Sequence, residues 1–254
     1  MIVGEQIGRN LDQHCLWMEI NIFAKTNSPL MKQLLIIVFL LIATESIAQK
    51  SDVGNWLIYF GNKQINKKWN WWHEGQYRSY NLLGDEEQLL IRTGIGYNLT
   101  ENNNNLLMGY AFVQSYPYIA GTDNKNNTTE HRLYQQFITR QQFGKVFIQH
   151  RYRLEERFLP NNNFRFRFRY FLGVNIPFNK PTLEKNAVYL SAYNEIFLHL
   201  NSPVFDRDRI YGAIGFGLSN QMRLETGLMY QVLENGNRPQ LQFALFNTLP
   251  FKKK

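Results

Sequence analysis

The most distinctive chemical groups in this sequence are guanidinium and carboxylate groups spaced two residues apart. Arg151, Arg153, Glu155 and Arg157 follow one another at this spacing, and arginines alternate with aromatic residues in the next segment, 164–170. Residues two apart lie on the same face of an extended strand, so each segment would present a row of charge on one side. Such rows predict either a network of ion pairs or a positively charged surface that selects anionic solutes.

The same spacing of charged residues recurs along the chain, which indicates one shared face of a sheet. A helix would distribute these charges around its circumference, so a helical interpretation fails. The predicted charged cluster consists of Glu74, Arg78, Arg92, Glu130, Arg132, Arg151, Arg153, Glu155, Arg157, Arg165, Arg167, Arg169, Glu195, Arg223 and Glu225. We favour an ion-paired filling of a narrow barrel over an anion-selective ladder, because narrow barrels fill their lumens with side chains.

The elements that would position these charges are about eleven short strands at even spacing. This spacing is typical of a β-sandwich or β-barrel, and no convincing amphipathic helix follows residue 49. Pro160 and the asparagines at 161–163 interrupt the two charged segments where a hairpin loop is expected. The expected strands are 55–61, 69–80, 88–98, 106–113, 130–141, the two halves of 149–171, 187–200, 210–218, 222–233 and 240–248.

Composition and charge narrow the possible functions. The chain has 254 residues, of which 44% are hydrophobic and 15% aromatic, and a formal net charge of +8. Such a length suits one domain with a sizeable interior. A nucleic-acid platform would need aromatic and basic side chains on one surface, whereas here they alternate between opposite faces. We therefore expect no nucleic-acid partner.

The beginning of the chain reads as a secretory signal peptide over 31–48. Lys32 precedes a short apolar run, and Ser46-Ile47-Ala48 has the small-residue pattern of a cleavage site. The alternative is an N-terminal membrane anchor, for which the apolar run is short. Residues 1–30 would then be a misassigned extension that contains the one cysteine, Cys15, and 49–254 would be a single exported domain.

Export, strand length and polarity together favour a membrane barrel. Strands of about ten residues suit a tilted membrane-spanning strand, with apolar side chains toward lipid and charged ones toward the lumen. We therefore expect an all-β, antiparallel up-and-down barrel of about 10–12 strands in the bacterial outer membrane, and an even number in particular. A soluble sheet is the alternative. Aromatic residues near strand ends are expected to form girdles at Trp56, Trp69, Tyr80, Phe158 and Phe178.

Loop lengths suggest which ends of the strands lie together. Short turns at 143–144 and 219–220 are expected at one end of the barrel, and long loops at 115–129 and 202–209 at the other. This pattern is typical of short periplasmic turns and longer external loops.

Several short motifs in the domain resemble the DUF2490 family of bacterial proteins. They include Trp56-x-x-Tyr59, Tyr193-Asn194-Glu195 and the Arg-Phe-Arg-Phe-Arg-Tyr strand at 165–170. Three further motifs are Glu74-x-Gln76-x-Arg78, Glu130-x-Arg132-x-Tyr134-Gln135-Gln136 and Arg151-x-Arg153-x-Glu155-x-Arg157. The resemblance covers about 55–251. It implies an outer-membrane barrel from a Bacteroidetes-like bacterium and leaves the activity open.

Catalytic and metal-binding motifs are weak in this sequence. No two of His73, His131, His150 and His199 have metal-ligand spacing, so no metal or cofactor is predicted. We expect a non-enzymatic barrel, either a small pore or a structural protein, with membrane lipid and anionic small solutes as partners. The oligomeric state is left open. The alternative is a phospholipase-like hydrolase that uses His199 and Ser202.

Overall fold

The described part of the chain is an all-β domain. The structure is a computed structural model and describes residues 53–82, 84–100, 103–234 and 236–248. All of these residues belong to one compact unit, Lys50–Lys254. The expected signal peptide, the extension before it and Cys15 lie outside the described residues. Within the described residues, no helix is long and apolar enough to cross a membrane.

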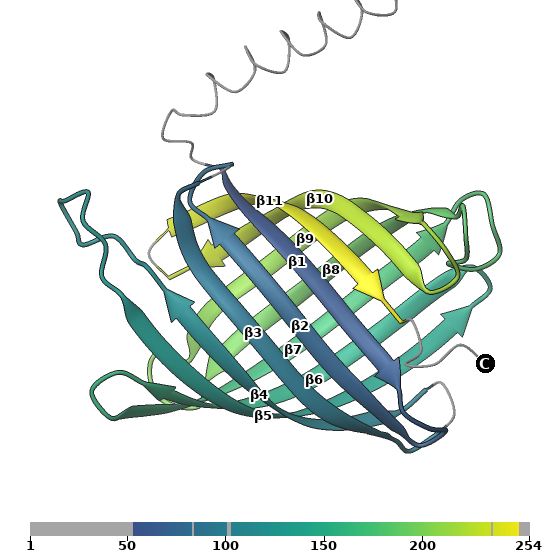
Figure 1. Cartoon of the computed structure of the whole chain (residues 1–254), viewed down its shortest axis with the longest axis horizontal. Helices are drawn as coiled ribbons and strands as arrows, with labels where there is room; N and C mark the ends of the chain where they lie inside the picture. Colours follow the sequence, from purple (N-terminus) through teal and green to yellow (C-terminus); the bar gives the residue numbers. More distant parts are fainter. Residues whose placement is uncertain (1–52, 83, 101–102, 235, 249–254) are drawn as a thin grey trace, which may run out of the picture. The chain divides into compact units, whose positions relative to one another are not determined.

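Eleven strands form the domain, and each runs antiparallel to the strand before it (Figure 1). The strands are β1 (Gly54–Gln64), β2 (Trp69–Ser79), β3 (Glu86–Asn98), β4 (Asn105–Ser115), β5 (Thr128–Phe143), β6 (Val146–Leu159), β7 (Asn163–Pro177), β8 (Val188–His199), β9 (Phe205–Gly217), β10 (Met222–Leu233) and β11 (Gly236–Asn247). The sheet closes on itself, which confirms the predicted barrel.

The barrel closes through one parallel pair, β1 with β11. Their register runs from Gly54 opposite Gln240 to Gly61 opposite Asn247. When strands alternate in direction, an odd number leaves the first and the last running the same way, so they pair in parallel. The expected total of about 10–12 strands is confirmed, but the expectation of an even number is wrong.

Side chains alternate between a charged inside and an apolar outside, as the spacing predicts. On β7, Arg167 and Arg169 are buried, whereas Phe164 and Phe166 are exposed. Large apolar residues elsewhere on the outer face are similarly exposed, up to 66% at Met108. A soluble barrel places these two kinds of residue the other way round.

Three histidines on the outer face each contact a tyrosine hydroxyl on the neighbouring strand. The contacts are His73 Nε2 with Tyr59 Oη at 3.2 Å, His131 Nδ1 with Tyr110 Oη at 2.6 Å, and His150 Nδ1 with Tyr170 Oη at 2.9 Å. Each contact gives a polar ring nitrogen a partner on a face that is otherwise largely apolar.

Two expectations about individual strands are wrong. The predicted loop 202–209 is shorter, because β9 begins at Phe205 instead of Ile210. Its first residues are charged and read as a loop, although their backbone pairs with β8. Trp56 was expected in an aromatic girdle, but it is 2% exposed and packs inside the barrel with Ile58 and Met229. Trp69, Phe158 and Phe178 are exposed at or near strand ends.

The two ends of the barrel differ in their connections. We call the end where β11 finishes the C-terminal end and the end where β1 starts the N-terminal end. The turns β5–β6 and β9–β10 lie at the C-terminal end, and the long β4–β5 connection lies at the N-terminal end, as expected. The β7–β8 connection, 178–187, is also long but lies at the C-terminal end, so the contrast in loop length is only partial.

The β4–β5 connection folds back onto the β2–β3 connection at the N-terminal end. Lys125 forms an ion pair with Asp85, and the Tyr118 hydroxyl donates a hydrogen bond to the same carboxylate at 2.9 Å. Tyr80 lies beside them, with the Lys125 ammonium 5.3 Å from its ring centre. Burial, together with the nearby Glu87 carboxylate, raises the pKa of Tyr80 to about 12. These contacts hold the loop against the β2–β3 connection.

Candidate functional site

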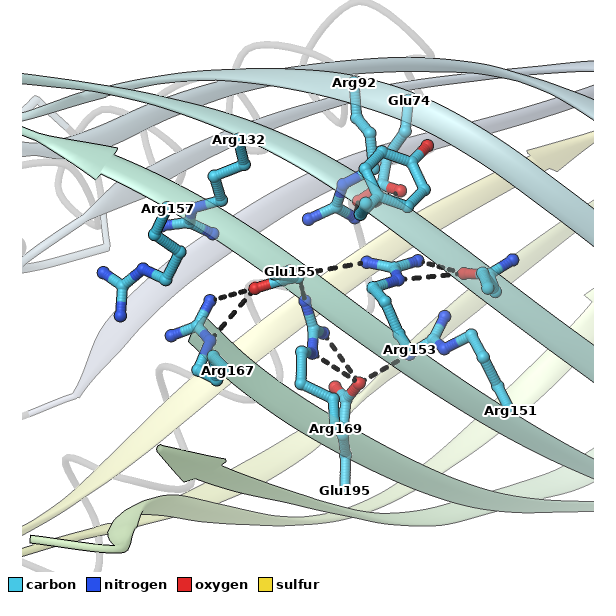
Figure 2. A network of polar contacts seen from close by, with 12 residues as sticks. Glu74, Arg92, Arg132, Arg151, Arg153, Glu155, Arg157, Arg167, Arg169 and Glu195 are labelled. Atoms are coloured by element: carbon cyan, nitrogen blue, oxygen red, sulfur yellow. Dashed lines mark hydrogen bonds and ion pairs between the residues drawn. The ribbon is translucent and has the colours of Figure 1, made fainter. Parts of the chain in front are cut away.

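The candidate site is a network of ion pairs inside the barrel, centred on Glu155 of β6 (Figure 2). Glu155 Oε2 accepts hydrogen bonds from Arg167 Nε at 3.0 Å and Nη2 at 2.5 Å. Its other oxygen accepts one from Arg169 Nη1 at 2.6 Å, and Arg153 Nη1 lies 3.6 Å away. One carboxylate, itself 1% exposed, thus faces three guanidinium groups.

A second carboxylate, Glu195 of β8, extends the network across the barrel. Glu195 Oε1 accepts hydrogen bonds from Arg151 Nη2 and Arg169 Nη2, both at 2.7 Å. Arg209 Nη1 lies 3.9 Å from the other oxygen. Because Arg169 bonds both Glu155 and Glu195, the charges of four consecutive strands, β6 to β9, are linked.

Two further carboxylates, on β2 and β5, pair with arginines of β3, β5 and β6. Glu130 on β5 forms two-pronged contacts with Arg132, at 2.7 and 2.9 Å, and with Arg157, at 2.5 and 3.0 Å. Glu74 on β2 accepts a hydrogen bond from Arg92 Nη1 at each carboxylate oxygen, both at 2.8 Å, and two more from Trp72 Nε1 and Gln76 Nε2. Bidentate pairing, as at Glu130, restricts the carboxylate and the guanidinium group to one relative orientation.

The network includes three residues that were not predicted, Asp206, Arg207 and Arg209. Arg207 opposes Phe197 on β8 and Phe205 opposes Leu198, so Asp206 has no partner in the register and forms a bulge. Its carboxylate accepts hydrogen bonds from Arg167 Nη1 at 2.8 Å and Arg207 Nη2 at 3.1 Å. The alternating charges at 206–209 are compatible with a strand that carries these residues, but a fully charged run is also typical of the loop predicted there.

We define the ion-pair network by its salt bridges. Its members are Arg92, Arg132, Arg151, Arg153, Arg157, Arg167, Arg169, Arg207 and Arg209 with Glu74, Glu130, Glu155, Glu195 and Asp206. Nine arginines therefore face five carboxylates. This leaves an excess of positive charge that other groups must stabilise.

Aromatic rings and amide oxygens stabilise the excess guanidinium groups. The ring centre of Phe197 lies 4.3 Å from the Arg169 guanidinium carbon and 4.5 Å from that of Arg209. Gln136 Oε1 accepts two hydrogen bonds from Arg153, at 2.9 and 2.5 Å. Cation–π contacts and neutral acceptors let arginine remain charged where carboxylates are too few.

Four of the predicted site residues lie outside the network. Arg78 is buried, donates to Gln76 Oε1 at 2.6 Å and lies over the Trp56 ring. Arg165 is exposed beside the β6–β7 turn, and Arg223 is half-buried. Glu225 is 4% exposed and accepts a hydrogen bond from the Tyr189 hydroxyl at 2.9 Å. The other eleven predicted residues are members of the ion-pair network.

The network and its neighbours fill the lumen in the N-terminal half of the barrel. Arg153 and Glu155 are 1% exposed, and Leu90, Val113 and Gln240 are equally buried. Side chains at this level are therefore closely packed inside the barrel.

Groups suited to catalysis or metal binding do not converge in the described residues. No three His, Cys, Asp or Glu side chains there are grouped so as to hold a metal ion. His199 Nε2 lies 3.9 Å from Asp206 Oδ1, and Ser202 is exposed in the β8–β9 connection. No hydrogen bond joins Ser202 to His199 in this part of the chain, the contact by which a histidine base would activate a serine.

Fold and site together define a closed β-barrel with an apolar exterior and a lumen filled by ion pairs. The chain belongs to the DUF2490 family, described as "Protein of unknown function", whose model matches residues 53–242. A search of curated proteins and a search of solved structures each find no significant match.

Proposed function

We propose that this protein is a non-enzymatic barrel of the bacterial outer membrane whose lumen is closed by the ion-pair network. The observation that carries this proposal is the inverted polarity of the barrel. Met108 and Leu228 are 66% and 63% exposed on the outside, whereas Arg153 and Glu155 are 1% exposed inside. Exposure of so many large apolar side chains to water is unfavourable, whereas contact with lipid stabilises them.

The energetic cost of the opposite arrangement supports this orientation. An arginine that faces lipid near the membrane midplane costs about 2–4 kcal/mol. Arg167 and Arg169 lie on one strand, so turning that strand over would place both in lipid at once. The outward histidines have tyrosine partners, which lowers the cost of placing them against lipid.

The filled lumen favours a structural role over a pore. Conduction requires a continuous aqueous path, whereas the side chains of the ion-pair network are closely packed and buried inside the barrel. The separation of Ser202 from His199 likewise favours a non-enzymatic protein. A phospholipid-hydrolysis assay of the intact protein is expected to detect no turnover, and turnover abolished by Ser202→Ala would contradict this.

Spin labelling in reconstituted vesicles tests the membrane orientation. In a Cys15→Ser background, Met108→Cys and Leu228→Cys each place a nitroxide label on the outer face. We expect oxygen, which concentrates in lipid, to relax these labels more strongly than a water-soluble nickel complex does.

The matched control is Arg165→Cys, because Arg165 is exposed beside a turn at the barrel end. There the nickel complex should be the stronger relaxant. Labels at 108 and 228 that respond mainly to nickel would show that the apolar face is not in lipid and would refute the proposal.

A further inference from the structure

A cavity of about 400 Å³ lies in the lumen beside the ion-pair network. Arg169 and Glu195 of the network form part of its wall. Arg140 and Thr248 also line it, and both are exposed at strand ends at the C-terminal end of the barrel. The cavity therefore reaches solvent at the C-terminal end of the barrel. Its volume is within the range of small-molecule sites.

The wall of this cavity carries a net positive charge. Six arginines and three glutamates line it, which gives a formal charge of +3. They are Arg92, Arg140, Arg151, Arg169, Arg209 and Arg223 with Glu74, Glu195 and Glu225. A positive wall in a recess of low dielectric attracts anions.

Two of these arginines, Arg140 on β5 and Arg223 on β10, line the cavity toward the C-terminal end of the barrel. Arg140 Nε donates to Gln149 Oε1 at 3.0 Å, and Arg223 lies over the Phe246 ring at 5.2 Å. Within the described residues neither forms an ion pair. An anion at this end of the cavity would offset their charges and receive charge-assisted hydrogen bonds.

Aromatic side chains form much of the remaining wall. Phe60 stacks on Phe246 with ring centres 4.9 Å apart, and Phe171 packs against Tyr193 at 5.0 Å. All four line the cavity. A small inorganic anion would leave these apolar surfaces without a partner, whereas a ligand with an apolar body would cover them.

We propose that this cavity is a binding site for a small organic anion, a carboxylate or a phosphate ester, with an aromatic or aliphatic body. Arg140 and Arg223 hold the anionic group at the opening. The body lies against Phe60, Phe246 and Phe171. Arg151 Nε, which is buried without a hydrogen-bond partner, offers a further donor in the wall. The barrel alone forms this site, so binding does not depend on the proposed membrane location.

Calorimetric titration of the full chain in detergent tests this site with four probes. Phenyl phosphate and benzoate combine an anionic group with an aromatic body, whereas inorganic phosphate and benzyl alcohol each supply one part. We expect phenyl phosphate or benzoate to bind saturably at one site. Its affinity should be at least about tenfold higher than that of inorganic phosphate or benzyl alcohol. The tighter of the two aromatic anions identifies the anionic group as phosphate ester or carboxylate.

Substitutions at the opening locate the site. Arg140→Gln and Arg223→Gln should each weaken the dissociation constant by about tenfold or more. The control is Arg165→Gln, which removes the same charge from the opposite end of the barrel and should leave affinity unchanged.

Three outcomes would overturn the proposal. They are the absence of saturable binding by both aromatic anions, benzyl alcohol binding as tightly as they do, and equal weakening by Arg165→Gln. If a variant fails to fold, the comparison of the four probes on the unmodified chain still tests whether the cavity binds an aromatic anion.

Discussion

At the scale of single residues, Glu155 shows what a carboxylate does in this lumen. It is 1% exposed and lies within 4 Å of three guanidinium groups. Removing the charge of a buried ion-pair partner is costly, because the remaining charges cannot be solvated by water. Glu155 is therefore the residue whose neutralisation should affect the stability of the barrel most.

Glu155→Gln is expected to lower the free energy of unfolding by about 3–5 kcal/mol, because it leaves Arg153, Arg167 and Arg169 partly uncompensated. Urea denaturation in detergent, followed by tryptophan fluorescence, measures this change. Glu156→Gln is the matched control, since Glu156 forms no ion pair within the described residues and accepts a hydrogen bond from Gln135 Nε2 at 3.1 Å. Equal losses for both variants would contradict the assigned role of Glu155.

Residue types and spacing were sufficient to predict which face most charged side chains occupy. Arg153, Glu155, Arg167 and Arg169 all lie inside, as the alternation indicates. The spacing could not predict which arginine meets which carboxylate. Those pairings depend on strand register and on a bulge at Asp206, which no local pattern specifies.

At the scale of strands, small residues make room for large inward side chains. Tyr134 on β5 is 1% exposed, and its hydroxyl donates to the Thr93 carbonyl oxygen at 3.1 Å. A Cβ atom added at Gly109 would lie 2.4 Å from the Tyr134 hydroxyl and 2.4 Å from the same carbonyl oxygen. Glycine at 109 is thus required by the close approach of β4 to this ring.

Gly109→Val should destabilise the barrel by about 1–3 kcal/mol, since it forces Tyr134 out of its position beside Arg153. Gly212→Val is the matched control, because a Cβ there meets no atom within 4 Å. The midpoint of urea denaturation measures both. A loss at 212 as large as that at 109 would show that β-strand glycines matter here for reasons other than packing.

Prediction of strands and of their inward faces failed where successive residues do not differ in polarity. Residues 56–60 of β1 are apolar on both faces, so their alternation does not indicate that Trp56 points inward. The first residues of β9 are charged on both faces and resembled a loop for the same physical reason. Elsewhere polar and apolar residues alternate, and most of the expected strands match.

At the scale of the whole molecule, eleven strands and one parallel pair place the two ends of the described chain at opposite ends of the barrel. The parallel seam is packed from inside by apolar residues of β1, β9, β10 and β11, among them Trp56, Met229 and Ala244. The lumen thus has an apolar side at the seam and an ion-paired side across β5 to β9. Both sides contribute to filling it.

Conductance of the full chain in planar lipid bilayers tests the central claim, that the ion-pair network closes the lumen. We expect no discrete conductance steps from protein whose folding is verified by a heat-dependent shift in gel mobility. Discrete, anion-preferring steps whose selectivity falls on changing Arg167 and Arg169 to Ser would contradict it, because they would show that these arginines line an open aqueous path.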